Sequence, residues 1–295
     1  MVGQVSVSEK MHAMFDRIKI YSHFPAEVYI DQPFPEWGDE FKEDLRALLR
    51  NHHVLILRGL ELAPADQVIF TSIFGDVAKP WDNHRTHPET ALVQVVSNAS
   101  RKESYKSVTL HWHSDESFTS RPTEYTVLHA LMVPSSGGDT LFADLHAAYR
   151  DYGEAAKRPL ARLKAVHSFR LLMGPMVAAR ISPEAARSEE ERFPDVRHPL
   201  VRTIPGTNQK AFFLNQLCVS YVEPLTATES TNLLNSLYTH CLQDMYIYSH
   251  KWRVRDTVIW DNSCLLHRVA NIPANEPRVL HRTTTSGQIP QGCED

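Results

Sequence analysis

Two histidines and two acids fall within six positions of the segment TLHWHSDESF, residues 109–118. Alternate side chains of a β-strand share a face, so His111, His113 and Asp115 would all point to one side of a strand here. A His-x-Asp pair on one face offers an imidazole nitrogen and a carboxylate oxygen to a single metal ion. The segment WDNSCLLHRVAN supplies a third candidate, His267. Together His113, Asp115 and His267 would form a two-histidine, one-carboxylate facial triad, which leaves positions open on ferrous iron.

The same residues also fit other roles. A His-x-Asp pair is commonly a hydrogen-bonded surface pair, and a histidine beside Cys-Leu-Leu is commonly a core residue. His111 competes with His113, because His-x-His is an equally acceptable pair of ligands. A zinc hydrolase would use His111, His113 and His267 as ligands and Asp115 or Glu116 as general base. A catalytically silent binding protein is a third class, and spacing alone leaves all three open.

The elements that must position these residues are mostly strands. Apolar residues at helical spacing predict three helices, over about 37–52, 64–73 and 226–242. The apolar run HVLILRGL predicts a buried strand, and segments rich in β-branched or aromatic residues predict further strands at 91–96, 123–133, 210–215, 245–252, 256–262 and 278–286. Many strands with a few helices outside them predict a mainly β fold with flanking helices, a double-sheet barrel or jelly roll. The charged stretch 180–198 is expected to be an exposed loop, with a mobile lid as the alternative.

Composition bounds the possible partners. The 295 residues carry 35 acidic and 31 basic side chains, a net charge of −4, with both signs interspersed. No cluster of basic residues indicates binding to nucleic acid or to a membrane surface. No apolar segment has the length of a signal peptide or a membrane span. We therefore expect a cytoplasmic enzyme that acts on small molecules. The four cysteines are scattered without a CxxC pair, which favours reduced thiols. We expect a single domain over 1–295, with disorder at the ends, about 1–20 and 287–295, and leave a homo-oligomer open.

Several motifs resemble one enzyme family in the same order along the chain. They are LHWHSDESF, VPSSGGDTLFADLHAAY, HPLVRT, HKWRVRDTVIWDNSCLLHR and RVLHRTT. The chain thereby resembles the taurine and phenoxyacetate dioxygenases (TauD/TfdA), which use Fe(II), 2-oxoglutarate and O2, from about residue 37 to residue 286. The resemblance implies a double-stranded β-helix core. It assigns the metal to His113, Asp115 and His267, and it leaves His111 outside the ligand set.

The same resemblance implies where 2-oxoglutarate binds. The threonine of GGDT, Thr140, would help to hold the cosubstrate, and Gly137 and Gly138 would form the turn that presents it. The arginine eleven residues after the distal histidine, Arg278, would pair with the C5 carboxylate, for which a planar guanidinium is suited. The implied reaction decarboxylates 2-oxoglutarate to succinate and hydroxylates a C–H bond of the substrate. Because Asp115 is present, hydroxylation rather than halogenation is expected, and the hydroxylated product can go on to cleave.

A second arginine bears on the substrate. Arg282 follows Arg278 by four residues, so both would face the same side of a strand. Relatives that act on sulfonates or carboxylates grip the substrate anion with the corresponding arginine, which predicts a small, carboxylate-bearing substrate. The alternative is that Arg282 only braces the site through a nearby acid. FGDVAKPWDN lacks the histidine that taurine-using relatives carry after their FG turn, which argues against taurine.

Overall fold

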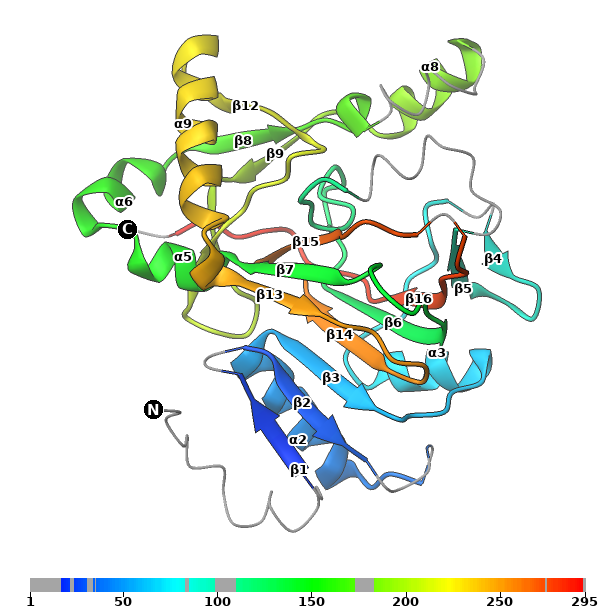
Figure 1. The fold of residues 1–295 in the computed structure, drawn as a ribbon. Coiled ribbons are helices and arrows are strands. Elements are labelled where there is room, and N and C mark those ends of the chain that lie inside the picture. The colour runs from blue at the N-terminus through cyan, green and yellow to red at the C-terminus, as the bar shows by residue number, and fades with distance from the viewer. Residues whose placement is uncertain are drawn as a thin grey trace.

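The structure is a computed structural model, and it describes residues 17–21, 24–30, 34, 36–82, 85–98, 110–172, 183–273 and 275–293. An eight-stranded sheet runs through it in the order β1-β2-β3-β14-β6-β16-β5-β4 (Figure 1). Its strands, in chain order, are β1 (Arg17–Ile20), β2 (Ala26–Tyr29), β3 (Val54–Arg58), β4 (Thr86–His87), β5 (Thr90–Ser97), β6 (Tyr125–Met132), β14 (Thr257–Asp261) and β16 (Val279–Thr284). Strands from both ends of the chain therefore share one sheet.

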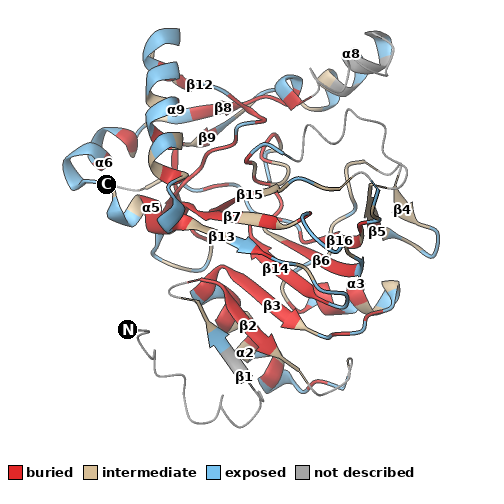
Figure 2. Cartoon of the chain, in the orientation of Figure 1, coloured by how far each residue is buried: buried red, intermediate tan, exposed pale blue. Residues whose placement is uncertain are grey.

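A second, three-stranded sheet packs against the first, in the order β13-β7-β15. It consists of β13 (Ile247–His250), β7 (Thr140–Asp144) and β15 (Leu265–Val269), all antiparallel. Side chains of both sheets meet in one core, in which Leu128 and Trp260 of the large sheet join Phe142 and Leu266 of the small one. Figure 2 shows the buried residues concentrated on β3, β14 and β7. Two sheets around one core agree with the expected jelly roll.

Helices cover the outside of this core. α2 (Asp39–His52) and α3 (Pro64–Ser72) lie over the large sheet, where Phe41, Leu45 and Phe70 pack on Leu55 and Leu57 of β3. Burying such side chains contributes roughly 1.5–3 kcal/mol each, which holds β3 and its neighbours in place. The remaining helices are α5 (Leu145–Asp151), α6 (Glu154–Leu160), α8 (Pro183–Arg192), α9 (Ala227–Cys241) and the 3-10 turn η1 (Asp244–Tyr246). α9 begins with a capping box between Thr226 and Glu229.

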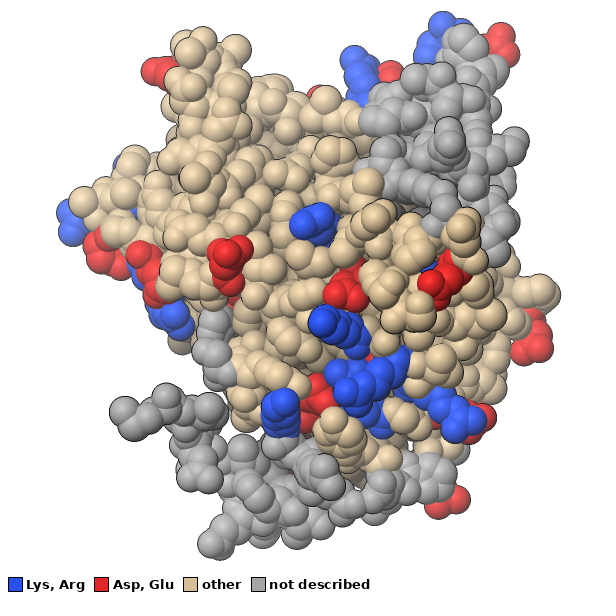
Figure 3. Space-filling view, in the orientation of Figure 1, with Lys and Arg blue, Asp and Glu red and all other residues tan. Residues whose placement is uncertain are grey.

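Two small sheets complete the described structure. β12 (Val219–Glu223), β8 (Lys164–His167) and β9 (Val196–Pro199) form one, beside α9, and β10 (Val201–Thr203) and β11 (Lys210–Phe212) form the other. On the face drawn in Figure 3, acidic and basic side chains lie side by side rather than in separate regions. No helix in the described part of the chain combines the length and hydropathy that a membrane span requires.

Most expected elements form, within a few residues of the expected bounds, and three expectations need correction. The segment around His113 is not a strand: His113 makes a single β-bridge, and a turn begins at Asp115. The stretch 180–198 is not a loop where it is described, because it forms α8 and then the start of β9, while 180–182 lie outside the described residues.

The expected disorder at the two ends is also wrong where the ends are described. Residues 17–20 form β1, and 1–16 lie outside the described residues. At the other end, the backbone N–H of Thr203 donates to the carbonyl of Gln291, and Gly292 forms a β-bridge with Arg202. The C-terminal segment is therefore held against β10 as far as residue 293, because β10 has a free edge for it to pair with.

Candidate active site

His113 and His267 come together through a reciprocal backbone bridge. The N–H of His113 donates to the carbonyl of His267 at 3.0 Å, and the N–H of His267 donates to the carbonyl of His113 at 2.8 Å. Residues paired in this way in an antiparallel bridge project side by side, and the two imidazole centroids are 4.2 Å apart. Asp115 reaches the same point, so that one ligand atom from each of the three residues lies within 4.8 Å of the others.

Asp115 is held by contacts that use one of its two oxygens. Its Oδ2 accepts from the Thr126 hydroxyl at 2.6 Å and lies 3.0 Å from Nη2 of Arg282. Its backbone N–H donates to Oδ1 of Asn262, which fixes the turn. The other oxygen, Oδ1, lies 3.8 Å from Nε2 of His267, beyond hydrogen-bond distance. The space between these two atoms is therefore suited to an ion that both would coordinate.

The charge states of the three residues also suit a metal. Burial alone would raise the pKa of Asp115, but the positive charge of Arg282, with the two histidines and the Thr126 hydroxyl, holds that pKa well below its usual range. Burial lowers the pKa of His113, and burial together with His113 lowers the pKa of His267 to about 3. An ionised carboxylate and two neutral imidazoles are the forms that bind a divalent cation.

The imidazole of His113 is oriented for coordination, and His111 is not part of the cluster. Nδ1 of His113 lies 2.8 Å from the carbonyl oxygen of His111, so Nδ1 carries the proton and Nε2 keeps its lone pair. His111 is exposed and contributes this carbonyl rather than its ring. The His-x-Asp pair, and not the His-x-His pair, is thus the one that meets His267.

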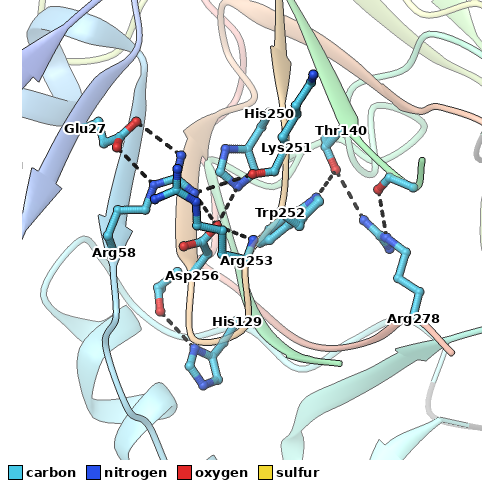
Figure 4. Close-up of polar contacts among 12 residues, drawn as sticks. Glu27, Arg58, His129, Thr140, His250, Lys251, Trp252, Arg253, Asp256 and Arg278 are labelled. Carbon is cyan, nitrogen blue, oxygen red and sulfur yellow. Dashed lines mark hydrogen bonds and ion pairs between the residues drawn. The ribbon is translucent and has the colours of Figure 1, made fainter. Parts of the chain in front are cut away.

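Thr140 and Arg278 line the same cavity as the triad, and Figure 4 shows them in contact with each other. Nη2 of Arg278 donates to the Thr140 hydroxyl at 3.3 Å, and Nε donates to the carbonyl of Gly138 at 3.0 Å. The indole N–H of Trp252 donates to the same hydroxyl at 3.0 Å. Gly137 has a φ of 75°, and a Cβ there would lie 2.7 Å from the carbonyl oxygen of Asn271, so only glycine is accommodated in this turn.

Arg282 of β16 and Arg278, which directly precedes β16, both line the cavity, as their four-residue spacing predicts. The guanidinium of Arg282 is engaged by protein groups: Nη2 with Asp115, and Nη1 with the amide oxygen of Gln94 at 2.6 Å. This geometry favours the bracing alternative, while the grip on a substrate anion stays a prediction. A guanidinium has five N–H groups, so contact with Asp115 and Gln94 does not exhaust it.

A cavity of about 200 Å³ connects these groups. Its walls are mainly apolar, and they include side chains that the sequence did not single out: Trp81, Phe118, Leu172 and Leu217. Phe118, Leu172 and Leu217 belong to one buried cluster against which Trp81 packs. Glu116 also lines the cavity, and its Oε1 is buried without a hydrogen-bond partner among the described residues. The position of Phe118, three residues after Asp115, was the one feature of the sequence that could have indicated an apolar cavity wall.

Comparison with known proteins identifies the family. The family model of the taurine catabolism dioxygenase TauD, TfdA family, matches residues 18–284. The chain belongs to this family. The TauD/TfdA resemblance inferred from the motifs is therefore confirmed, as are the expected fold class and the expected dioxygenase, an oxidoreductase.

Individual TauD/TfdA relatives agree with this assignment. The α-ketoglutarate-dependent 2,4-dichlorophenoxyacetate dioxygenase of Burkholderia sp. (strain RASC) is 33% identical over 251 residues, 80% of this chain and 82% of that protein. The enzyme of the same name from Cupriavidus pinatubonensis is 32% identical, over 84% of this chain and 89% of that protein. α-Ketoglutarate is 2-oxoglutarate. The relatives support the dioxygenase and not the zinc hydrolase.

Solved structures place the chain in the same fold. AAD-2 in complex with Mn(II) and N-oxalylglycine superposes with a TM-score of 0.78 at 26% identity, covering 93% of this chain and 98% of that one. A taurine dioxygenase from Burkholderia xenovorans superposes with a TM-score of 0.77 at 23% identity, covering 94% and 91%. The second likeness shows the fold alone. Fe(II), 2-oxoglutarate and O2 are the cofactors of this class of enzyme, and the donor set of His113, Asp115 and His267 suits the metal.

Proposed function

We propose that this dioxygenase hydroxylates a small, carboxylate-bearing organic substrate, with Fe(II) held by His113, Asp115 and His267. One observation carries the proposal: two neutral imidazoles and an ionised carboxylate converge within 4.8 Å at the wall of a mainly apolar cavity. This is the donor set of facial-triad ferrous oxygenases, which leaves coordination positions for the cosubstrate and oxygen. When bound, Fe(II) with 2-oxoglutarate and O2 would supply the oxidising chemistry, in which one oxygen atom goes to form succinate with loss of carbon dioxide and the other to the substrate.

The residues of the chain would bind and orient the reactants. Arg278 would pair with the C5 carboxylate of 2-oxoglutarate, and Thr140 would donate its hydroxyl proton to the same group. Both are buried, so the ion pair would form away from solvent and be stronger than a surface pair. The indole N–H of Trp252 donates to the Thr140 hydroxyl and orients it. Arg282 and Thr126 keep Asp115 ionised and aimed towards His267.

The cavity supports an organic substrate with an apolar body. Trp81, Phe118 and Leu217 supply wide apolar surfaces, which suit an aromatic or aliphatic group. The two relatives named above are 2,4-dichlorophenoxyacetate dioxygenases. Two further relatives are an (S)-phenoxypropionate dioxygenase and a sulfate ester dioxygenase. Small anionic substrates are common to all of them. We place the anion near Arg282, because this guanidinium lines the cavity beside the metal ligands.

The test is succinate release by the purified enzyme, supplied with Fe(II), 2-oxoglutarate and air. Phenoxyacetate, its methyl ester and a short alkyl sulfate are compared as substrates. A carboxylate substrate should stimulate succinate release above the substrate-free rate, and its ester should not. Stimulation by the sulfate ester alone would move the substrate class from carboxylates to sulfates. Succinate release that does not depend on added Fe(II) would contradict the proposed metal centre.

We also propose that residues 1–295 form a single catalytic domain in a reducing compartment, the cytoplasm. β1 and β16 belonging to one sheet support a single domain. All four cysteines, Cys218, Cys241, Cys264 and Cys293, are free thiols, which supports a reducing compartment. Limited proteolysis should leave one protected core, and two separable fragments that each fold would contradict the single domain.

A further inference from the structure

A second group of metal-ligating side chains lies away from the active cavity. One imidazole nitrogen of His53, one carboxylate oxygen of Asp261 and the thiol sulfur of Cys264 lie within 4.8 Å of one another. All three residues are buried, with exposed fractions of 4%, 3% and 0%. His53 ends α2 and leads into β3, Asp261 ends β14, and Cys264 stands in the turn that leads to β15.

The backbone holds the three residues together. The N–H of Asp261 donates to the carbonyl of His53 at 3.0 Å, which joins the ends of β14 and β3. The N–H of Leu145 donates to the carbonyl of Cys264 at 2.9 Å, which fixes the turn against the start of α5. These contacts come from strand pairing and a tight turn, so backbone hydrogen bonds set the relative positions of the three residues.

His53 occupies a backbone position that favours glycine. Its φ is 59°, in the left-handed region, where a side chain other than glycine is strained by roughly 1 kcal/mol. The imidazole is nevertheless buried, and its Nδ1 has no hydrogen-bond partner among the described residues. Asp261 and Cys264 make local contacts only: Oδ1 of Asp261 accepts from the N–H of Ser263 at 2.7 Å, and the thiol of Cys264 donates to the carbonyl of Asp261 at 3.8 Å. A buried polar atom left without a partner costs about 1–3 kcal/mol, so this cluster is incomplete as the protein alone builds it.

Further charged groups lie around the cluster. Asp144 is a second carboxylate whose charge acts on both His53 and Cys264. Arg202, also buried, acts on Asp261 and Cys264. Glu124 is a third carboxyl group that acts on Asp261 and Arg202, so the carboxyl groups here outnumber the one guanidinium. A cation bound here would offset part of that negative charge.

We propose that His53, Asp261 and Cys264 form a second, buried site for a divalent cation of the zinc type. Imidazole, carboxylate and thiolate are the three protein ligands of Zn(II), and the thiolate disfavours Mg(II) and Ca(II). Zinc–ligand bonds of about 2.0–2.3 Å place tetrahedral ligand atoms roughly 3.5 Å apart. Ligand atoms at the 4.8 Å limit would therefore have to approach by about 1 Å. Because its ligands come from the turns that flank β3, β14 and β15, a bound ion would stabilise these strands together.

Metal counting tests this site independently of catalysis. Untagged protein is stripped with a chelator, reconstituted with Zn(II), desalted and analysed by elemental mass spectrometry. The variant His113→Ala/His267→Ala, which lacks two ligands of the active-site triad, should retain one Zn(II) per chain. Adding Cys264→Ala to it should reduce the count to zero. A count of zero in the first variant would overturn the proposal.

Cobalt provides a second readout on the wild-type chain, so the test does not depend on variants that fail to fold. The active-site triad contains no sulfur, whereas Cys264 would give Co(II) a thiolate-to-metal charge-transfer absorption in the near ultraviolet. The absorption should appear in the wild type and disappear in Cys264→Ala. Cys218→Ala is the matched control, because Cys218 is another buried thiol and lines the active cavity. An absent band in the wild type, or a band lost with Cys218, would contradict the site.

Discussion

Arg282 forms an ion pair with Asp115, and both side chains lie inside the active cavity. Nη2 of Arg282 is 3.0 Å from Oδ2 of Asp115, while the opposite oxygen of the carboxylate faces His267. The side chains of Arg282 and Asp115 are 15% and 12% exposed, so solvent screens the pair little. The arginine thereby favours the ionised carboxylate and decides which of its oxygens is left for a metal.

Replacing Arg282 with alanine should therefore weaken metal binding as well as substrate binding. Removing one partner of a buried pair costs about 3–5 kcal/mol, of which part will appear as lost Fe(II) affinity. We expect Fe(II) affinity to fall at least tenfold, measured by titration under anaerobic conditions. Gln94→Ala is the control, because it removes the other contact of the guanidinium and leaves the pair with Asp115. Unchanged Fe(II) affinity with a raised KM for the substrate alone would instead assign Arg282 to the substrate anion.

The proposed triad makes a second prediction. His113→Ala, Asp115→Ala and His267→Ala should each abolish turnover and lower bound Fe(II), because each removes one of three protein ligands from an open site. His111→Ala should be much milder, since His111 contributes its backbone carbonyl and its ring is exposed. Iron content and succinate release are measured together. Loss of iron in His111→Ala with retention in His113→Ala would show that the ligands are wrongly assigned.

The motifs around His113 and His267 were sufficient to predict that the three triad residues lie together. His113 and Asp115 are two residues apart, and the structure joins them to His267 although the segment is a bridge and a turn, not the expected strand. The alternation of side chains along a strand was therefore not the reason that His113 and Asp115 point to the same place. Asn262 supplies the actual reason. Its Oδ1 accepts from the N–H of Asp115, and its Nδ2 donates to the hydroxyl of Thr126, so the turn is held beside β6.

Contacts between residues far apart in the chain could not be predicted. The pairing of Arg282 with Asp115 depends on β16 lying beside β6, which also carries Thr126. The hydrogen bond from Trp252 to Thr140 likewise depends on β13 pairing with β7. Hydrophobic patterns predict that strands exist, but they do not determine which strands become neighbours. Most of the outer fold follows from local patterns, whereas the environment of each site residue follows from topology.

Arg278 should control the affinity for 2-oxoglutarate. Arg278→Ala would leave the cosubstrate carboxylate without a charge-assisted partner, at a cost of about 2–5 kcal/mol, which raises its KM by roughly 30-fold or more. Metal content should stay at the wild-type level, because Arg278 contacts Gly138 and Thr140 rather than the triad. Arg268→Ala, which removes an arginine stacked on Trp112, serves as the control. An unchanged KM in Arg278→Ala would place the cosubstrate anchor elsewhere.

Trp252 should act on the same KM by a smaller amount. Trp252→Phe keeps an aromatic ring beside Arg278 and deletes the N–H that donates to Thr140. The loss of one neutral hydrogen bond corresponds to about 0.5–1.5 kcal/mol, or roughly a 2- to 10-fold rise in the KM for 2-oxoglutarate. The kcat at saturating 2-oxoglutarate should stay near the wild-type value. A fall in kcat with an unchanged KM would show that Trp252 only supports the fold.

The buried pair between Glu27 and Arg58 should make stability depend on pH. Nε of Arg58 lies 3.1 Å from Glu27, Arg58 also contacts Asp256, and the Glu27 side chain is 2% exposed (Figure 4). Burial alone would raise the pKa of Glu27, but hydrogen bonds from Arg58, Tyr29 and Tyr21 lower it to about 2.

A carboxyl group whose pKa is lower in the folded state than in the unfolded state stabilises the fold above the unfolded pKa, here 4.5. That contribution is lost as the pH falls from 4.5 towards 2, because the unfolded state takes up a proton at Glu27 before the folded state does. Glu27→Gln should therefore lower the free energy of unfolding by about 3 kcal/mol at pH 7, since it leaves Arg58 with a lost buried partner. The difference from wild type should shrink below pH 4.5. Glu43→Gln, which removes an exposed partner of Arg46 and Arg50, should have no measurable effect at either pH. Urea unfolding at pH 7 and pH 3.5 measures both differences, and a Glu27→Gln deficit that is the same at the two pH values would show that its pKa is not lowered by folding.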